Sequence, residues 1–336
     1  MNAPASKPLE VYSRLRGGSV RTLRQEVREW EDLGVTGVLV SDHLFGTATG
    51  SRREADRPPE PLTLLAATGA LSDRLHVGTI VSNASLLHPA LLLRQFAELA
   101  VLLGGDRVLA GIGAGWNRPE FEALGMRMPS FGERMERLEE AAALARQLFD
   151  DGYANLEGKH VVARDLPFAP SPEVPPRLML GGGSRRLLEI AGRYADALDL
   201  NGSPQAGKVS GPDLRTADKR RRLSTTVADL EGSAEVVRQA SLQAGRPADA
   251  VGRSIMLTEI VFCAESEVSQ NEEVLWAAAG LPSRSLDDCP YAAIGPPERM
   301  ARLVQERRAR LALSRLFVSG PQVERFCREV LPLLQA

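Results

Sequence analysis

The amino-acid sequence predicts an α/β fold of the (β/α)8 barrel class, also called the TIM barrel. Short apolar runs bounded by turn residues alternate with longer amphipathic stretches, a pattern typical of βα units around a parallel sheet. Eight such units follow one another in 336 residues, a length that suits one barrel. We therefore expect a single domain over residues 1–336.

The expected barrel strands are the apolar runs of these units. They lie at 9–13, 36–41, 75–81, 107–112, 177–181, 197–201, 255–263 and 314–318. The run at 9–13 is the weakest, because it is short and polar, so this barrel strand is the one expected to form poorly.

The expected helices carry apolar residues at helical spacing. They lie at 20–33, 61–71, 89–103, 132–150, 184–194, 227–244 and 320–334. Gly104 and Gly105 follow the third of these stretches, as glycines do after a helix C-cap.

Three connections are longer than the others, at 42–60, 113–131 and 202–226. Each would leave the carboxyl end of a strand, which is the face of a barrel that carries the active site. Long loops there commonly form lids or substrate walls. The charged run DKRRR at 218–222 is interpreted as a solvated loop or a partner-facing turn.

Composition favours a small-molecule partner. With 41 basic and 43 acidic residues the formal net charge is -2, too weak a field to hold nucleic acid or an anionic membrane. The three cysteines are widely spaced without a C-x-x-C pair, which indicates neither a disulfide framework nor a metal site. With no signal-peptide core and no run of transmembrane length, we expect a soluble cytoplasmic protein.

The first candidate for chemistry is the pair Asp42 and His43, at the end of the second expected strand. Imidazole can move protons near neutral pH, and an adjacent carboxylate can fix its tautomer or raise its pKa. The competing interpretation is structural, with Asp42 capping the loop and His43 packed beneath it.

The second candidate is the glycine-rich run at 111–117, directly after the fourth strand. Gly113 and Gly115 would let the backbone approach a ring or a phosphate closely, and Trp116 would supply a flat face. The run lacks the spacing and the βαβ context of a dinucleotide-binding fingerprint. The alternative is a plain turn.

The third candidate is the turn of Gly181, Gly182, Gly183 and Ser184 between the fifth strand and a helix. Free N–H groups, the helix dipole and the serine hydroxyl would all point at a phosphate there. The alternative is a flexible βα turn in which Ser184 only caps the helix.

The fourth candidate is the end of the third strand, where Thr79, Ser82 and Asn83 lie. Asn83 could bond the edge of a heterocycle, and Thr79 or Ser82 could bond a ring carbonyl. His88 before Pro89 is interpreted equally well as a helix-start residue without chemistry.

Taken in order, these segments resemble the luciferase-like monooxygenase family of flavin and deazaflavin oxidoreductases. The resemblance covers roughly residues 8–335, and the glycine-tryptophan motif is its most diagnostic part. The matching stretches are SDHL at 41–44, and those at 77–99, 105–126, 178–202 and 291–304.

The resemblance implies a luciferase-like barrel whose carboxyl-end loops hold an isoalloxazine-type ring, with the GGGS turn on the cofactor phosphate. It favours the branch that uses coenzyme F420, with Asp42 and His43 beside the ring and His43 handling the proton of a hydride transfer. It also implies a backbone bulge at Thr79–Asn83, sometimes with a non-proline cis peptide. A homodimer is implied as well.

Two alternatives stay open. One is an FMN-dependent monooxygenase on the same barrel, which would take reduced flavin from a partner reductase and use oxygen. The other is a non-catalytic flavin-binding barrel. The sequence departs from the family pattern at Leu87, where an arginine is usual before the His-Pro pair, and at Gly104 and Gly105, where a serine is usual; this leaves the detailed loop geometry undetermined.

Overall fold

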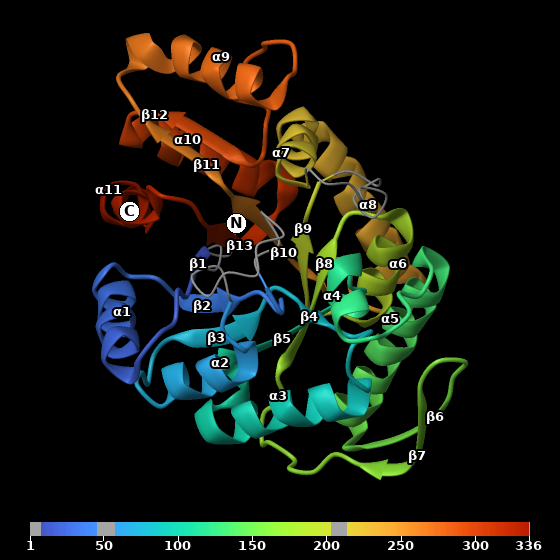
Figure 1. Ribbon diagram of the computed structural model, residues 1–336. Helices are drawn as coiled ribbons and strands as arrows, with labels where there is room; N and C mark the ends of the chain where they lie inside the picture. The colour runs from blue at the N-terminus through green and yellow to red at the C-terminus, as the bar shows by residue number, and fades with distance from the viewer. Residues whose placement is uncertain (1–7, 46–57, 203–213, 336) are drawn as a thin grey trace, which may run out of the picture.

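The computed structural model describes residues 8–45, 58–202 and 214–335, and at its centre lies a closed parallel sheet. The strands run in the order β3-β2-β1-β13-β10-β9-β8-β5, and pairing of β3 with β5 closes the barrel (Figure 1). The predicted (β/α)8 class is confirmed. The barrel strands are Glu10–Arg14 (β1), Gly37–Val40 (β2), His76–Thr79 (β3), Val108–Gly113 (β5), Arg177–Gly182 (β8), Ala197–Leu200 (β9), Gly252–Leu257 (β10) and Leu313–Val318 (β13).

Strand β1 is well formed, although its sequence is short and polar. Tyr12 lies opposite Gly37 of β2 on one side and Phe317 of β13 on the other. The polar residues do not disturb the strand, because Val11 packs outward against the helices while Tyr12 fills the barrel interior.

The third strand ends earlier than predicted. β3 stops at Thr79, the peptide bond between Ile80 and Val81 is cis, and a two-residue strand, Ser82–Asn83 (β4), then pairs with β5. The implied irregularity at Thr79–Asn83, with a non-proline cis peptide, is therefore present.

The seventh predicted strand, at 255–263, is wrong as a single strand. β10 belongs to the barrel, whereas Glu259–Phe262 (β11) leaves it and pairs in parallel with Ala292–Gly295 (β12) in a separate small sheet. The chain turns at Thr258, where the N–H groups of Thr258 and Glu259 both donate to the carbonyl of Tyr291 at 3.1 Å. The polar pair Thr258 and Glu259 interrupts the apolar run at this point, and it was the available signal for the change of sheet.

Helices cover the outside of the barrel (Figure 1). Each predicted helix has a counterpart, and the last is divided in two. The helices are Val20–Asp32 (α1), Pro61–Gly69 (α2), Pro89–Leu103 (α3), Arg118–Ala123 (α4), Phe131–Arg146 (α5), Arg185–Tyr194 (α6), Leu214–Ser224 (α7), Val227–Gln243 (α8), Val268–Ala279 (α9), Pro297–Leu311 (α10), Val323–Glu329 (α11) and Leu331–Gln335 (α12). None of the helices within the described ranges is long and apolar enough to cross a membrane.

Several elements were not predicted. The DKRRR run lies inside α7, not in a loop or turn, because the charged residues have good helix propensity. α4, α9 and α10 were also missed, as was the antiparallel hairpin of Tyr153–Glu157 (β6) and Val162–Pro167 (β7). Two of the three long connections, 42–60 and 202–226, are described only in part, because residues 46–57 and 203–213 lie outside the described residues.

The buried apolar residues form two clusters. The larger cluster fills the layer between the strands and the helices. The smaller one fills the barrel interior with Tyr12, Leu39, Leu109, Met179, Ala197 and Phe317. Since strand side chains alternate, this division identifies which strand residues face into the barrel.

Candidate active site at the carboxyl ends of the strands

The four predicted segments gather at one end of the barrel. His43 follows β2, Ser82 and Asn83 form β4, Trp116 follows β5, and the glycine turn closes β8. These strands are neighbours in the sheet, so their carboxyl ends meet on the same face.

His43 is held by a carboxylate from a distant part of the chain. Its Nδ1 lies 3.0 Å from Oε1 of Glu120, and the same oxygen accepts the backbone N–H of Leu44 at 3.0 Å. The Glu120 side chain is 2% exposed and that of His43 is 21% exposed. A carboxylate only accepts, so Nδ1 carries the proton and Nε2 of the neutral ring is left as a proton acceptor.

Glu120 was not among the residues that the sequence predicted for the site. It lies in the first turn of α4, only four residues after Trp116. A glutamate one helical turn beyond a candidate ring contact was the available signal, but nothing in the sequence shows that it faces His43.

Asp42 has a different role from the one expected of an adjacent carboxylate. Its Oδ2 accepts the backbone N–H of Asn83 at 3.0 Å, which ties the end of β2 to β4. Burial raises the pKa of Asp42, although this hydrogen bond and the neighbouring His43 act in the opposite direction. The hydrogen bond that orients His43 comes from Glu120 and not from Asp42.

Trp116 lies against His43. The two ring centroids are 5.7 Å apart and the planes meet at 76°, an edge-on arrangement. Trp116 is nevertheless 43% exposed, an unusual degree of exposure for tryptophan at the mouth of a barrel. The indole therefore offers a large apolar face to a ligand that binds at the carboxyl ends of the strands.

The polar side chains predicted at the end of the third strand differ in whether they have hydrogen-bond partners. The Thr79 hydroxyl donates to the carbonyl of Gly111 at 2.6 Å, so it serves the barrel and is not free to bond a ring carbonyl as predicted. Asn83 Oδ1 accepts the N–H of Ser85 at 2.9 Å. The Ser82 hydroxyl is buried and finds no hydrogen-bond partner among the described residues. Ser82 is in register with Ile112, which packs toward the helices, so its side chain faces away from the barrel interior and the predicted bond to a ring carbonyl is not supported.

Gly113, the last residue of β5, and Gly115 make room for the segment that contains Val81 and Asn83. A Cβ on Gly113 would lie 2.4 Å from Cγ2 of Val81, and one on Gly115 would lie 2.3 Å from Oδ1 of Asn83. Gly115 also has φ +74°, which disfavours other residues. The glycine-rich run is thus required for close packing at the barrel mouth and is more than a plain turn.

The GGGS turn leads into α6. The Ser184 hydroxyl accepts the N–H of Leu187 at 3.3 Å as an N-cap. A Cβ on Gly183 would lie 2.5 Å from the carbonyl oxygens of Asn201 and Gly202, so only glycine fits. The cap leaves the N–H groups of Arg185 and Arg186 without a helical partner, which is the arrangement that binds a phosphate.

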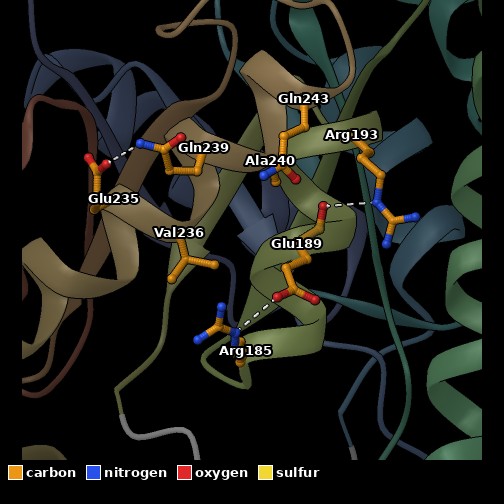
Figure 2. Close-up of a pocket in the computed structure, with 8 residues that line it drawn as sticks. All are labelled: Arg185, Glu189, Arg193, Glu235, Val236, Gln239, Ala240 and Gln243. Atoms are coloured by element: carbon orange, nitrogen blue, oxygen red, sulfur yellow. Dashed lines mark hydrogen bonds and ion pairs between the residues drawn. The ribbon is translucent and has the colours of Figure 1, made fainter.

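A groove of about 370 Å³ lies elsewhere, between α6 and α8 on the outside of the barrel. Figure 2 shows Arg185 directed at Glu189 along α6 and Glu235 at Gln239 along α8, on the two sides of the groove. Its residues are Arg185, Glu189, Arg193, Glu235, Val236, Gln239, Ala240 and Gln243. Charges that already neutralise one another give little affinity for a charged ligand, and no predicted site residue lines the groove.

The donor set at the barrel mouth suits an organic ring with a phosphate tail. A glycine-lined backbone, an exposed indole and a helix N-terminus are all present. Within the described ranges no group of three or more His, Cys, Asp or Glu is placed to hold a metal ion, and the three cysteines are free.

Comparisons with known proteins agree with this description. Residues 6–314 match the family described as luciferase-like monooxygenase. The chain is 26% identical to an F420-dependent glucose-6-phosphate dehydrogenase of Microbacterium testaceum, over 89% of this chain and 81% of that protein. With the enzyme of that name from Kribbella flavida it shares 31% identity, but over 49% of this chain and 48% of that protein, about half of each.

A solved structure described as an F420-dependent secondary alcohol dehydrogenase in complex with an F420-acetone adduct has the same fold. It superimposes with a TM-score of 0.73 at 16% identity, covering 98% of this chain and 100% of that one. Since the family match extends over most of the sequence and the barrel agrees with it, the chain belongs to the luciferase-like monooxygenase family.

Proposed function

We propose that the protein is an F420-dependent oxidoreductase that transfers a hydride between the deazaflavin and a small organic substrate. The observation that carries the proposal is the His43–Glu120 pair beside Trp116 at the barrel mouth. The curated relatives, which are named as F420-dependent enzymes, support the same cofactor.

The residues of this chain supply binding and proton handling. When bound, the deazaflavin supplies a carbon that accepts or donates a hydride. The N–H groups at the start of α6 would hold its phosphate, and Trp116 would contact the ring or the substrate beside it. Position and orientation account for a large part of the rate in such sites.

His43 would handle the proton. As an alcohol carbon loses a hydride, the hydroxyl loses its proton to Nε2 of His43, and a carbonyl product forms; reduction runs the same steps in reverse. Glu120 fixes the ring with Nδ1 protonated and stabilises the imidazolium once Nε2 takes up the proton.

Glucose 6-phosphate is the first substrate to assay, because it is named for the curated relatives. The proposal for this chain is the broader class of hydroxyl- or carbonyl-bearing small molecules. We expect the long connections at 42–60, 113–131 and 202–226 to set the choice of substrate, because loops differ most between members of one fold.

A second candidate is an FMN-dependent monooxygenase, favoured by the description of the family itself. It would need reduced flavin from a partner reductase. A flavin-binding barrel without catalysis is a third candidate, and His43 with its buried carboxylate argues against it.

The test is a fluorescence titration of the purified protein with F420 and FMN in parallel, followed by anaerobic turnover with glucose 6-phosphate and simple alcohols. Preference for F420 and oxygen-independent turnover are expected. Preference for FMN, with oxygen consumption in the presence of a flavin reductase, would overturn the proposal.

The homodimer and the cytoplasmic location stay predictions. Leu91 and Leu102 on α3 are more than half exposed, as an interface between two copies would require. Sedimentation analysis of the purified protein would test the dimer.

A further inference from the structure

A carboxyl group is buried inside the barrel near the candidate site and has no cationic partner among the residues that the structure describes. Asp199 is 1% exposed. It lies on β9, where Leu198 and Leu200 pack outward and Ala197 faces the barrel interior, so Asp199 faces inward as well. Its hydrogen bond comes from the Ser254 hydroxyl on β10 at 2.9 Å.

Two of the other three buried carboxylates that the structure describes are better compensated: Glu26 is paired with Arg16, and Glu120 contacts His43 and an N–H group. The third, Glu272 on the outer helix α9, also has one neutral donor, the N–H of Leu286. Asp199 has a single neutral hydroxyl. A buried anion without a cation is costly, so such a group is commonly retained for a functional reason.

Asp199 lies close to the segment on which the proposed ring would rest. It is in register with Gly181 of β8, the first glycine of the proposed phosphate turn. A Cβ on Gly181 would lie 3.1 Å from Cγ1 of Val81, which belongs to the irregular segment between β3 and β4. The carboxyl group is therefore one strand away from that segment, and we take it as part of the floor of the proposed ring pocket.

The groups around Asp199 favour its neutral form. Burial raises the pKa of Asp199 to about 6, and the Ser254 hydroxyl acts in the opposite direction. Tyr291, which bonds the carbonyl of Leu200 at 2.9 Å, stays neutral because burial raises its pKa as well. Two cations inside the barrel, Arg177 and Arg315, both pair with Glu10 of β1. Arg315 is in register with Ser254, but its side chain is directed to Glu10.

We propose that Asp199 is a proton-holding positioning residue in the pocket floor, and that F420 binding at the barrel mouth is accompanied by proton uptake at this carboxyl group. The inference rests on the proposed function. A ring over the mouth removes the remaining water and further disfavours the carboxylate. A neutral floor also keeps a negative charge away from a ring that gains electrons with a hydride.

The test is calorimetric titration of the full chain with F420 in buffers of different ionisation enthalpy, between about pH 6 and pH 8. Wild-type protein should take up a proton, and its affinity should fall as the pH rises. The fall should approach about tenfold for each pKa unit by which binding shifts the group. Asp199→Asn should bind F420 with uptake reduced to that of the cofactor alone.

Two variants sharpen the result. Ser254→Ala removes the hydrogen bond that favours the carboxylate, so the range of proton uptake should move to higher pH. Asp249→Asn removes an exposed carboxylate outside the pocket and should behave like wild type. Infrared difference spectra of wild-type protein with labelled aspartate should show the carbonyl stretch of a protonated acid when F420 is added, which tests the inference even if Asp199→Asn fails to fold.

The outcomes separate the two proposals. F420 binding with equal proton uptake in wild type and Asp199→Asn, or no new acid band, would overturn this inference alone. Failure of wild-type protein to bind F420 would overturn both it and the proposed function.

Discussion

The two ends of the barrel use polar residues in opposite ways. At the amino-terminal end of the strands, Glu10 bonds Arg315 at 2.7 Å and Arg177 at 3.2 Å, while the Tyr12 hydroxyl lies 2.9 Å from Nδ1 of His76. At the carboxyl end, in contrast, His43 bonds Glu120 through Nδ1, and its Nε2 has no partner among the residues that the structure describes.

The difference separates stability from chemistry. Arg177 also approaches Nδ1 of His76 at 3.2 Å, and an arginine only donates, so this nitrogen is an acceptor and the imidazole is neutral. Burial and Arg177 lower the pKa of His76 accordingly. A network in which the Glu10 carboxylate pairs with two guanidinium groups closes one end of the barrel, and the residues of the candidate site lie at the other.

The largest effect is expected at His43. His43→Ala should lower turnover about 10²-fold to 10⁴-fold, the usual contribution of a general acid or base. F420 affinity and the thermal unfolding midpoint should change little. Steady-state kinetics beside a binding titration would measure this, and retained turnover would remove the proton-handling role.

Glu120→Gln should come next. The amide oxygen can still accept from Leu44 and from Nδ1, so the ring orientation is kept while the charge that stabilises the imidazolium is lost. We expect turnover to fall about a hundredfold, with a changed pH–rate profile. Glu120→Ala should lose orientation as well; if both variants were as active as wild type, the pair would be structural only.

At the other end, Glu10→Gln should affect stability and not binding. Burial alone would raise the pKa of Glu10, but the charges of Arg315 and Arg177 outweigh it and lower the pKa. Breaking the pair should reduce the unfolding free energy by about 2 kcal/mol, below the full value for buried pairs because Glu10 is partly exposed.

The pH dependence of that loss has a definite sign. Because the folded pKa of Glu10 lies below the unfolded value, the stabilisation is present above about pH 4 and is lost as the pH falls through the folded pKa. Urea unfolding of both proteins at several pH values should therefore converge in acid. A gap that persisted or widened there would contradict the network.

These two ends also differ in how far sequence alone could predict them. The barrel strands were predictable because their apolar runs are short and bounded by turn residues. His43 and the GGGS turn were predictable because each follows such a run. The His43–Glu120 contact joins residues 77 apart, and no local pattern encodes a contact of that kind.

Asp199 was hidden for a related reason. Within ALDLN it resembles any polar residue of a strand, and only the alternation of Ala197 and Leu198 between the two clusters shows that it faces the barrel interior.

The charge network at Glu10 was missed because β1 was judged by its polarity. Its polar residues are partners of residues on β3, β8 and β13, which the sequence does not place beside them.

The smallest expected effect sharpens the comparison within the carboxyl end. Ser184 caps α6, so Ser184→Ala should cost about 1 kcal/mol of stability, as lost N-caps do. If the turn also binds a phosphate, F420 affinity should fall severalfold, whereas removal of the Ser19 cap of α1 should reduce stability similarly and leave affinity unchanged. Parallel thermal denaturation and F420 titration of Ser184→Ala and Ser19→Ala would measure both. Equal affinity in the two variants would mean that Ser184 serves the helix alone, and that the phosphate is held by backbone N–H groups or bound elsewhere.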